Sequence, residues 1–280
     1  KGPMVALHNE EYIKSHDGLS LFFQTWTPTT GSSSTADVLI VHGYGEHGGR
    51  YRELAHAFAE GGIITHTVDL RGHGRSDGRR GHVDHFAHYL NDVDCALEQL
   101  NHKLPQFILG HSLGGLISID YVCSRQPPIN GLIVSNPFLA LAMEVPALKL
   151  KVAEIAGNLA PRFALPNGLK SGDISRVAEI ANRYERDPLI FSTATAGWVR
   201  EANSAQDRVR AYDRVTAPLY YLYSDSDPIA CPNASRILSK QLRSPDKTIE
   251  ERPDELHEIL NEIDRHQLHK DVASWIQGRL

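Results

Sequence analysis

A serine in the middle of the chain has the surroundings of a nucleophile. Ser112 lies in the sequence G-H-S-L-G at residues 110–114, directly after an apolar run at 107–109 and before a helical pattern at 113–123. In a strand–turn–helix context, G-x-S-x-G lifts the serine hydroxyl out of a sheet, at the positive end of the next helix. The sequence therefore predicts that Ser112 attacks a carbonyl carbon in an acyl-transfer reaction.

A serine hydroxyl is a weak nucleophile, so a base and an orienting acid are expected elsewhere in the chain. In the chain order typical of this motif, the acid follows the serine and the histidine follows the acid. Asp227 comes after the apolar run 219–223, and His257 comes after the extended stretch 247–252. We therefore predict Asp227 as the acid and His257 as the base. The alternatives are Asp225 for the acid and, for the base, His266 and His269 in the final helical pattern.

A second glycine-containing turn, H-G-Y-G at residues 42–45, follows the apolar run 38–41. Acyl transfer generates an oxyanion, which two fixed backbone N–H groups stabilise far better than water does. We expect one donor from this turn and one from the residue after the nucleophile. The prediction is an oxyanion hole formed by the amides of Tyr44 and Leu113; the alternative is a glycine-rich turn without a function.

Continuous apolar runs predict the strands that position these groups. Continuous rather than alternating apolar character is typical of parallel strands covered on both faces, and helical patterns fill the gaps between them. This alternation predicts an α/β protein with a mostly parallel, doubly wound sheet. An earlier run, 19–27, predicts an N-terminal hairpin strand that closes on the polar loop 29–35. The other predicted strands are 38–41, 63–68, 107–109, 132–134 and 219–223, and the predicted helices are 51–60, 86–100, 113–123 and 232–242.

Residues 135–213 interrupt the alternation, because they show helical periodicity, five prolines and no convincing strand. A structureless loop of that length is improbable in a compact domain, so we predict a helical insertion placed as a lid above the sheet. Apolar residues at its start form either a hydrophobic mouth for an acyl chain or the packing surface of the insertion. They are Phe138, Leu139, Leu141, Met143, Val145, Leu148 and Leu150.

Composition excludes several classes of protein. The 280 residues include 29 lysines and arginines against 34 acidic residues, a net charge of -5, which argues against a nucleic-acid partner. Three cysteines without C-x-x-C spacing favour a reducing, cytoplasmic location over a disulfide framework. We find no apolar run typical of a signal peptide and no roughly 20-residue uncharged run that could span a bilayer.

Two further patterns could suggest a metal site or a phosphate site. His82, His85 and His88 are spaced by three residues, but this spacing drifts around a helix and no carboxylate or thiol completes a site. The glycine-rich stretch 72–81 lacks the G-K-[ST] of a phosphate-binding loop and is interpreted as a turn. We predict no metal and no cofactor.

Taken together, the motifs resemble the monoacylglycerol lipase and lysophospholipase family of α/β-hydrolases, also described as serine aminopeptidase-like. The resemblance implies an α/β-hydrolase core at 1–136 and 216–280, a helical cap at 137–215, and hydrolysis of monoacylglycerol or lysophospholipid esters. It also implies that Glu46 and Arg50 contact a glycerol-like group. The matching stretches are HGYGEHGGRY at 42–51, DLRGHGRSDG at 69–78, GHSLGG at 110–115, NP at 136–137, DPL at 187–189 and HEILNE at 257–262.

The chain departs from the family pattern at two positions, Ser224 before the acid and Asp254 before the base, where relatives usually have glycine. Other functions stay open: a general carboxylesterase, an acyltransferase, an aminopeptidase, or a ligand-binding protein of this fold without catalysis. Dehalogenases and epoxide hydrolases place a carboxylate where this chain has Ser112. A transient contact between the cap and a membrane surface is compatible with the apolar residues of the cap, and the protein would then be peripheral.

Overall fold

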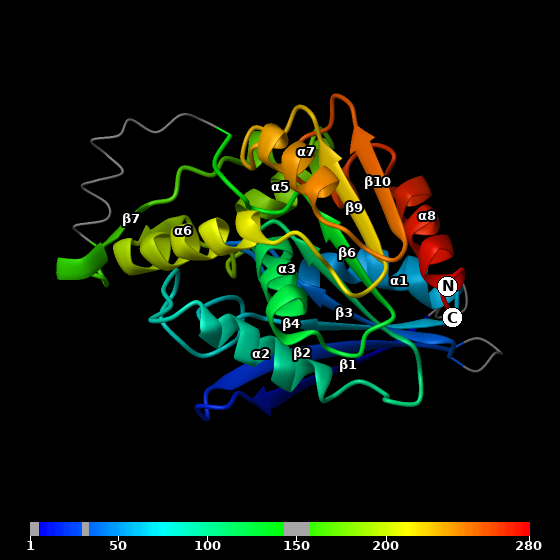
Figure 1. Ribbon diagram of the computed structural model, residues 1–280. Helices are drawn as coiled ribbons and strands as arrows, with labels where there is room; N and C mark the ends of the chain where they lie inside the picture. The colour runs from blue at the N-terminus through cyan, green and yellow to red at the C-terminus, as the bar shows by residue number, and fades with distance from the viewer. Residues whose placement is uncertain (1–5, 30–33, 143–156) are drawn as a thin grey trace.

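One twisted sheet forms the centre of the molecule (Figure 1). The computed structural model describes residues 6–29, 34–142 and 157–280 of the chain. The strands of this sheet are β1 (Ala6–Lys14), β2 (Ser20–Pro28), β3 (Ala36–Val41), β4 (Ile63–Val68), β5 (Gln106–His111), β6 (Gly131–Ser135), β9 (Leu219–Ser224) and β10 (Lys247–Arg252). Their spatial order is β1-β2-β4-β3-β5-β6-β9-β10.

The sheet is mostly parallel, as the apolar runs predicted. The pairs from β4 to β10 are parallel, and only β1–β2 and β2–β4 are antiparallel. Every residue of β3, β6 and β9 is buried, because both faces of these central strands are covered. The carboxyl ends of the parallel strands therefore meet at one edge, where ligands of open α/β sheets usually bind.

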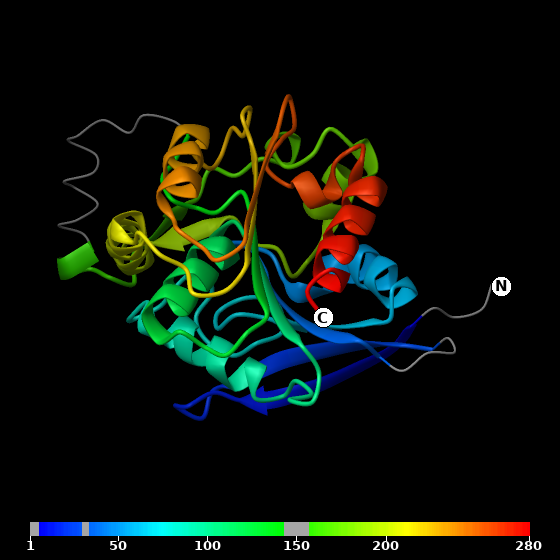
Figure 2. The ribbon, with the colours of Figure 1, turned by 45° about the vertical axis from the view of Figure 1, so that its right-hand side comes forward.

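Helices cover both faces of the sheet (Figure 2). Helices α1 (Arg52–Glu60) and α8 (Arg265–Gln277) contact each other on one face and share an apolar core with the strands. Helices α2 (Ala87–Leu97), α3 (Leu113–Arg125) and α7 (Pro232–Gln241) lie on the other face. The predicted doubly wound arrangement is thereby confirmed.

The N-terminal hairpin differs from the prediction. Strand β2 pairs with β1, which precedes it, and the hairpin turn contains Asp17 and Gly18 rather than the polar loop that follows β2. Gly18 has a φ of +82°, a backbone conformation that glycine adopts without a steric cost. The Asp-Gly pair was the sequence signal for this turn.

The segment between β6 and β9 contains helices, as expected, but also two strands that were not predicted. Strands β7 (Ala164–Pro166) and β8 (Thr193–Thr195) form an antiparallel pair. Three residues are too few to show a hydrophobic period, and their pairing depends on tertiary contacts. The segment also contains η2 (Ser171–Asp173), α5 (Ala178–Arg186) and α6 (Ala196–Ala211).

Helix α6 is part of the main core rather than a separate layer. Its buried residues Ala202, Ala205 and Val209 belong to the same apolar cluster as α2 and α3, and α6 lies against α3 (Figure 1). The cap boundaries 137–215 stay a prediction. Of the apolar residues expected at the start of the cap, Met143, Val145, Leu148 and Leu150 lie outside the described residues.

Candidate active site

Ser112 occupies a sharp turn between β5 and α3. Its φ of +52° is uncommon for a residue with a side chain, and such backbone strain is often found at functional sites. A Cβ added to Gly114 would overlap the carbonyl oxygen of Val41, and one added to Gly110 would overlap that of Gly114. The two glycines of the motif are therefore required because the backbone of the turn packs too closely for side chains.

Three of the predicted residues form one hydrogen-bonded chain. His257, after β10, places Nε2 2.8 Å from the Oγ of Ser112 and Nδ1 2.7 Å from Oδ2 of Asp227, after β9. The carboxylate of Asp227 can only accept, so Nδ1 carries the proton and Nε2 offers its lone pair to the serine hydroxyl. Asp227 is itself fixed, since its Oδ1 accepts from the amides of Ile229 and Ala230 at 2.8 and 3.0 Å. All three side chains are buried.

The rival residues lie elsewhere. Asp225 is exposed and accepts hydrogen bonds from the hydroxyl of Ser226 and the amide of Asp254. His269 on α8 contacts the carbonyl oxygen of Leu260. His266 on α8 lies beside Glu53. Asp225 and Asp227 both follow the end of β9, so the sequence alone could not show which of them contacts His257. The structure shows that it is Asp227.

Electrostatics differ sharply between the two histidines near Ser112. Burial would lower the pKa of His257, but the charge of Asp227 and the hydrogen bond to it outweigh burial and leave the pKa above its ordinary value. Burial, together with the nearby His257, lowers the pKa of His111 to about 3. His111 is therefore neutral at ordinary pH. Of the two histidines, only His257 has a raised pKa, and its Nε2 lies 2.8 Å from the Oγ of Ser112.

Asn136 is a residue of this site whose role sequence reasoning missed. Its side-chain amide donates to the carbonyl oxygen of His257 at 2.6 Å, and its Oδ1 accepts from the amide of Ser224 at 2.8 Å. The hydroxyl of Ser224 in turn donates to the carbonyl oxygen of Glu255. The loop that carries Asp227 and the loop that carries His257 are thus tied together. The Asn-Pro pair at 136–137 was visible as a motif, but not what it contacts.

Ser224 and Asp254, the two departures from the family pattern, are both accommodated by the structure of these loops. The hydroxyl of Ser224, which glycine would lack, supplies the cross-link to Glu255. Asp254 has a φ of +58°, in the left-handed region that glycine favours and aspartate tolerates better than most residues. Neither departure displaces Asp227 or His257 from the hydrogen-bonded chain.

The loop at residues 42–45 lies against Ser112. A Cβ added to Gly43 would lie 3.3 Å from the Cβ of Ser112. The amides of Tyr44 and Leu113, the expected oxyanion donors, have no acceptor among the parts of the chain that the structure describes. Two N–H groups left for an incoming oxygen are what an oxyanion hole requires. The assignment of these donors stays a prediction.

Glu46 and Arg50 form a buried ionic cluster with Glu258. Glu46 accepts from the Gly43 amide at 2.6 Å and from the Tyr51 hydroxyl at 2.8 Å, and it also pairs with Arg50. Arg50 contacts both carboxylate oxygens of Glu258. Burial would raise the pKa of Glu46, but the charges of Arg50, His111 and His42 and the hydrogen bond from Gly43 together outweigh it and hold the pKa below its ordinary value. Glu46 thus supports the loop beside Ser112, and Arg50 ties Glu46 to Glu258, the residue after His257.

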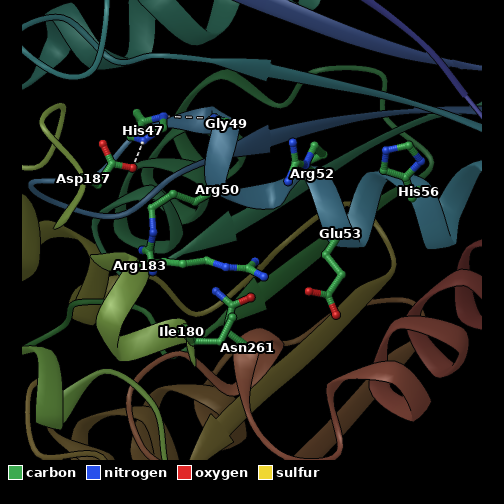
Figure 3. Close-up of a pocket in the computed structure, with 10 residues that line it drawn as sticks. All are labelled: His47, Gly49, Arg50, Arg52, Glu53, His56, Ile180, Arg183, Asp187 and Asn261. Atoms are coloured by element: carbon green, nitrogen blue, oxygen red, sulfur yellow. Dashed lines mark hydrogen bonds and ion pairs between the residues drawn. The ribbon is translucent and has the colours of Figure 1, made fainter. Parts of the chain in front are cut away.

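A polar cavity of about 370 Å³ adjoins Arg50, and it contains none of Ser112, Asp227 and His257 (Figure 3). Side chains from several elements face this space: α1, α5 and the loops around them. On one side of it, Nε2 of His47 lies 2.9 Å from Oδ2 of Asp187. Its lining residues are His47, Gly49, Arg50, Arg52, Glu53, His56, Ile180, Arg183, Asp187 and Asn261. The cavity leaves room for a polar group next to Arg50.

The histidines at 82, 85 and 88 do not form a metal site within the described residues. His82 uses both ring nitrogens within the protein, at 2.8 Å from Oγ1 of Thr195 and 3.2 Å from Oδ1 of Asp84. Within residues 6–29, 34–142 and 157–280, no three His, Cys, Asp or Glu side chains are grouped to hold a metal ion. In the same described residues, no helix has the length and apolar character needed to cross a membrane.

The strand order, the helices on both faces and the serine on a strand–turn–helix define an α/β-hydrolase fold. Residues 32–264 match the family described as serine aminopeptidase, S33, and the chain belongs to that family.

Two curated relatives and one solved structure illustrate the similarity. The chain is 30% identical over 280 residues to the monoacylglycerol lipase of Mycolicibacterium smegmatis, a match covering 98% of this chain and 99% of that protein. It is 30% identical over 272 residues to an uncharacterized abhydrolase domain-containing protein of Dictyostelium discoideum, covering 96% of this chain but 29% of that protein. The crystal structure of Paleococcus ferrophilus monoacylglycerol lipase matches with a TM-score of 0.81 and 29% identity, covering 99% of this chain and 100% of that one.

Proposed function

We propose that this protein hydrolyses carboxylic esters of lipids, with monoacylglycerol or lysophospholipid as the substrate. The observation that carries the proposal is the hydrogen-bonded chain Ser112–His257–Asp227, at 2.8 and 2.7 Å. Its residue types, order and geometry match those of a serine-hydrolase triad. The names of the similar monoacylglycerol lipases support the class of substrate.

In the first half-reaction, Nε2 of His257 removes the proton from Ser112 as Oγ bonds to the ester carbonyl carbon. The carbonyl oxygen becomes an oxyanion, and the amides of Tyr44 and Leu113 are proposed to bind it. When the tetrahedral intermediate collapses, the carbon–oxygen bond to the alcohol breaks, and His257 gives its proton to the leaving oxygen. The product is an acyl-enzyme on Ser112.

In the second half-reaction, water replaces the alcohol. His257 removes a proton from the water as its oxygen bonds to the acyl carbon, and the proton returns to Oγ of Ser112 when the acid is released. Asp227 keeps the imidazole in one orientation and stabilises the imidazolium that forms in each step. The scheme is complete without a metal or a cofactor.

The leaving alcohol is proposed to lie toward Glu46 and Arg50. Arg50 lines the polar cavity, so hydroxyl groups of a glycerol-like product have polar partners and space on that side. Both oxygens of Glu46 already accept hydrogen bonds within the protein. Arg50 also has partners, in Glu46 and Glu258, but it lines the cavity and Glu46 does not. Of the two residues, Arg50 is therefore proposed to contact substrate, while Glu46 holds the adjoining loop.

The acyl chain is proposed to lie between the core and the cap at 137–215. Near the start of that segment, Leu139 is buried, Phe138 stacks on Trp198 with ring centroids 6.3 Å apart, and Leu141 is 46% exposed. Exposed apolar residues here suit a transient contact with a lipid surface. We place the protein in the cytoplasm, since Cys95, Cys123 and Cys231 are all free thiols.

A substrate panel tests the proposal. Purified protein is assayed with monoacylglycerols, lysophospholipids, p-nitrophenyl esters and amino-acid amides, each with and without an added alcohol acceptor. We expect the largest kcat/KM of the panel for one of the two lipid classes, monoacylglycerols or lysophospholipids. Preferred cleavage of acetyl esters would favour a short-chain carboxylesterase, transfer to the alcohol an acyltransferase, and cleavage of amides an aminopeptidase. Binding without turnover in every assay would favour a non-catalytic receptor.

A further inference from the structure

The backbone around Tyr44 is only partly held by residues of its own loop. Gly43 and Gly45 flank it, and Gly45 has a φ of +77°, so both neighbours have the wide conformational freedom of glycine. An oxyanion donor is effective only when its N–H direction is held before the reaction begins. Within the loop, Nδ1 of His42 donates to the carbonyl oxygen of Gly43 at 2.7 Å, on the same peptide unit as the Tyr44 amide. Contacts that the Tyr44 side chain makes outside the loop add a second restraint on the direction of this amide.

The side chain of Tyr44 supplies such contacts. Its hydroxyl donates to the carbonyl oxygen of Thr193 at 2.8 Å, at the start of β8. Its ring lies 4.0 Å from that of Trp198 and 5.5 Å from that of Phe191, centroid to centroid. The next residue of the loop is held as well, because the amide of Phe191 donates to the carbonyl oxygen of Gly45 at 3.1 Å. Residues 191–198 therefore contact the loop at two consecutive residues, Tyr44 and Gly45.

Residues 191–198 are themselves held in place by hydrogen bonds to Gly81 and His82. The amide of Thr195 donates to the carbonyl oxygen of Gly81 at 3.0 Å, and Oγ1 of Thr195 lies 2.8 Å from Nδ1 of His82. Nearby, Asp187 pairs with His47 at 2.9 Å, at the other end of the same loop. The segment therefore has a fixed position from which to hold Tyr44.

We propose that Tyr44 is a positioning residue whose side chain, held by residues 191–198 of the insertion, sets the direction of its own backbone amide toward the reacting oxygen. The insertion then contributes to the oxyanion hole as well as to the space for substrate. This inference rests on the proposed function only in assuming ester chemistry at Ser112. Under this inference, the rate of the reaction depends on contacts between Tyr44 and residues more than 140 positions further along the chain.

The test removes only the hydroxyl. In Tyr44→Phe, we expect kcat for an activated ester to fall about tenfold while KM changes by less than twofold, since complete loss of one donor costs roughly 10²–10³ in kcat. The affinity for an alkyl boronic acid, which forms a tetrahedral adduct on the serine, should fall by the same factor as kcat/KM. Tyr121→Phe is the matched control, because the Tyr121 hydroxyl bonds to Asp94 away from the site. It should leave both quantities unchanged.

A purely structural role for Tyr44 would lower Tm without changing kcat per active site, which fluorophosphonate titration counts. That result, or a boronate affinity unchanged while kcat falls, would overturn the inference. Trp198→Phe is the second variant: it retains the hydroxyl but loosens the ring contact, and a smaller parallel loss of kcat and boronate affinity is expected. Wild-type turnover of the activated ester without turnover of any lipid would contradict the proposed substrate and leave this inference standing.

Discussion

Asn136 donates a 2.6 Å hydrogen bond from its side chain to the backbone carbonyl of His257, 121 residues further along the chain. With its Oδ1 on the amide of Ser224, the same side chain joins the loop of His257 to the loop of Asp227. The hydrogen-bonded chain at Ser112 therefore depends on a residue that takes no part in proton transfer.

Asn136→Asp keeps the size of the side chain and removes its donor. A buried carboxylate facing the His257 carbonyl is unfavourable, and loss of the bond should cost about 1–3 kcal/mol in the free energy of unfolding. We expect kcat to fall as well, because the His257 loop shifts. Urea denaturation and steady-state kinetics measure both effects. Asn130→Asp is the control, since Asn130 uses only its Oδ1, on the amide of Gln106; equal stability of the two variants would contradict the role of Asn136.

Ser112→Ala should abolish ester hydrolysis, with kcat reduced by about a millionfold as for other serine hydrolases. The fold should persist because the turn depends on its glycines. A fluorophosphonate probe should label the wild type and Ser124→Ala, a control variant in the helix α3 that follows Ser112, but not Ser112→Ala. Persistent labelling of the alanine variant would rule out Ser112 as the nucleophile.

Asp227→Asn should lower kcat on the order of 10⁴, as for the orienting aspartate of serine proteases, because the amide favours the wrong tautomer of the base. Asp225→Asn, two residues away on an exposed loop, should change kcat by less than twofold. Steady-state kinetics on the pair of variants decides between the two acids. A larger loss in the Asp225 variant would reverse the assignment.

The pH profile should report His257. Protonated His257 cannot accept the serine proton, so kcat/KM should fall as the pH drops through a pKa above 6.5, the direction in which Asp227 moves it. His111, with a pKa of about 3, should contribute nothing between pH 5 and 8. Asp227→Asn should move the acidic limb of the residual activity to lower pH. An unmoved limb in that variant would assign the titration to another group.

The raised pKa of His257 also affects the free energy of unfolding. Activity should fall at low pH, whereas this contribution to stability should fall at high pH. A folded-state pKa above the unfolded value means that the native protein binds the proton more tightly. The contribution of His257 to the free energy of unfolding is therefore full below about pH 6.5 and is lost as the pH rises through the folded pKa. Urea denaturation of wild type and His257→Gln across this range measures that contribution.

Acyl-chain length should control turnover. Burying each methylene contributes about 0.8 kcal/mol, roughly fourfold in kcat/KM at most, so we expect a rise from two-carbon to at least eight-carbon esters. Leu141→Asp should flatten the trend, and we expect the same of Met143→Asp, which lies outside the described residues. Ile237→Asp, an exposed apolar position on α7, is the control. A wild-type preference for acetyl esters would contradict the lipid substrate.

The sequence by itself determined the layers of the fold and the order of the candidate residues. Both are local signals: continuous apolar runs separated by helical patterns predict a parallel sheet, and the glycines around Ser112 predict a tight turn after a strand. Asp227 and His257 could be chosen because each follows a strand whose carboxyl end meets the edge that carries Ser112. Strand boundaries such as 63–68 and the extended stretch 247–252 agree with β4 and β10.

Only the tertiary structure decided how these residues are held. The separation of Asp227 from Asp225, the cross-link through Asn136, the pair β7–β8 and the contact of Tyr44 with Thr193 all join parts of the chain that no local pattern relates. Hydrophobic periodicity records which face of a segment is buried, not which distant group it meets. A hydrogen bond depends on distances within a few tenths of an ångström, and the packing of the whole chain sets those distances.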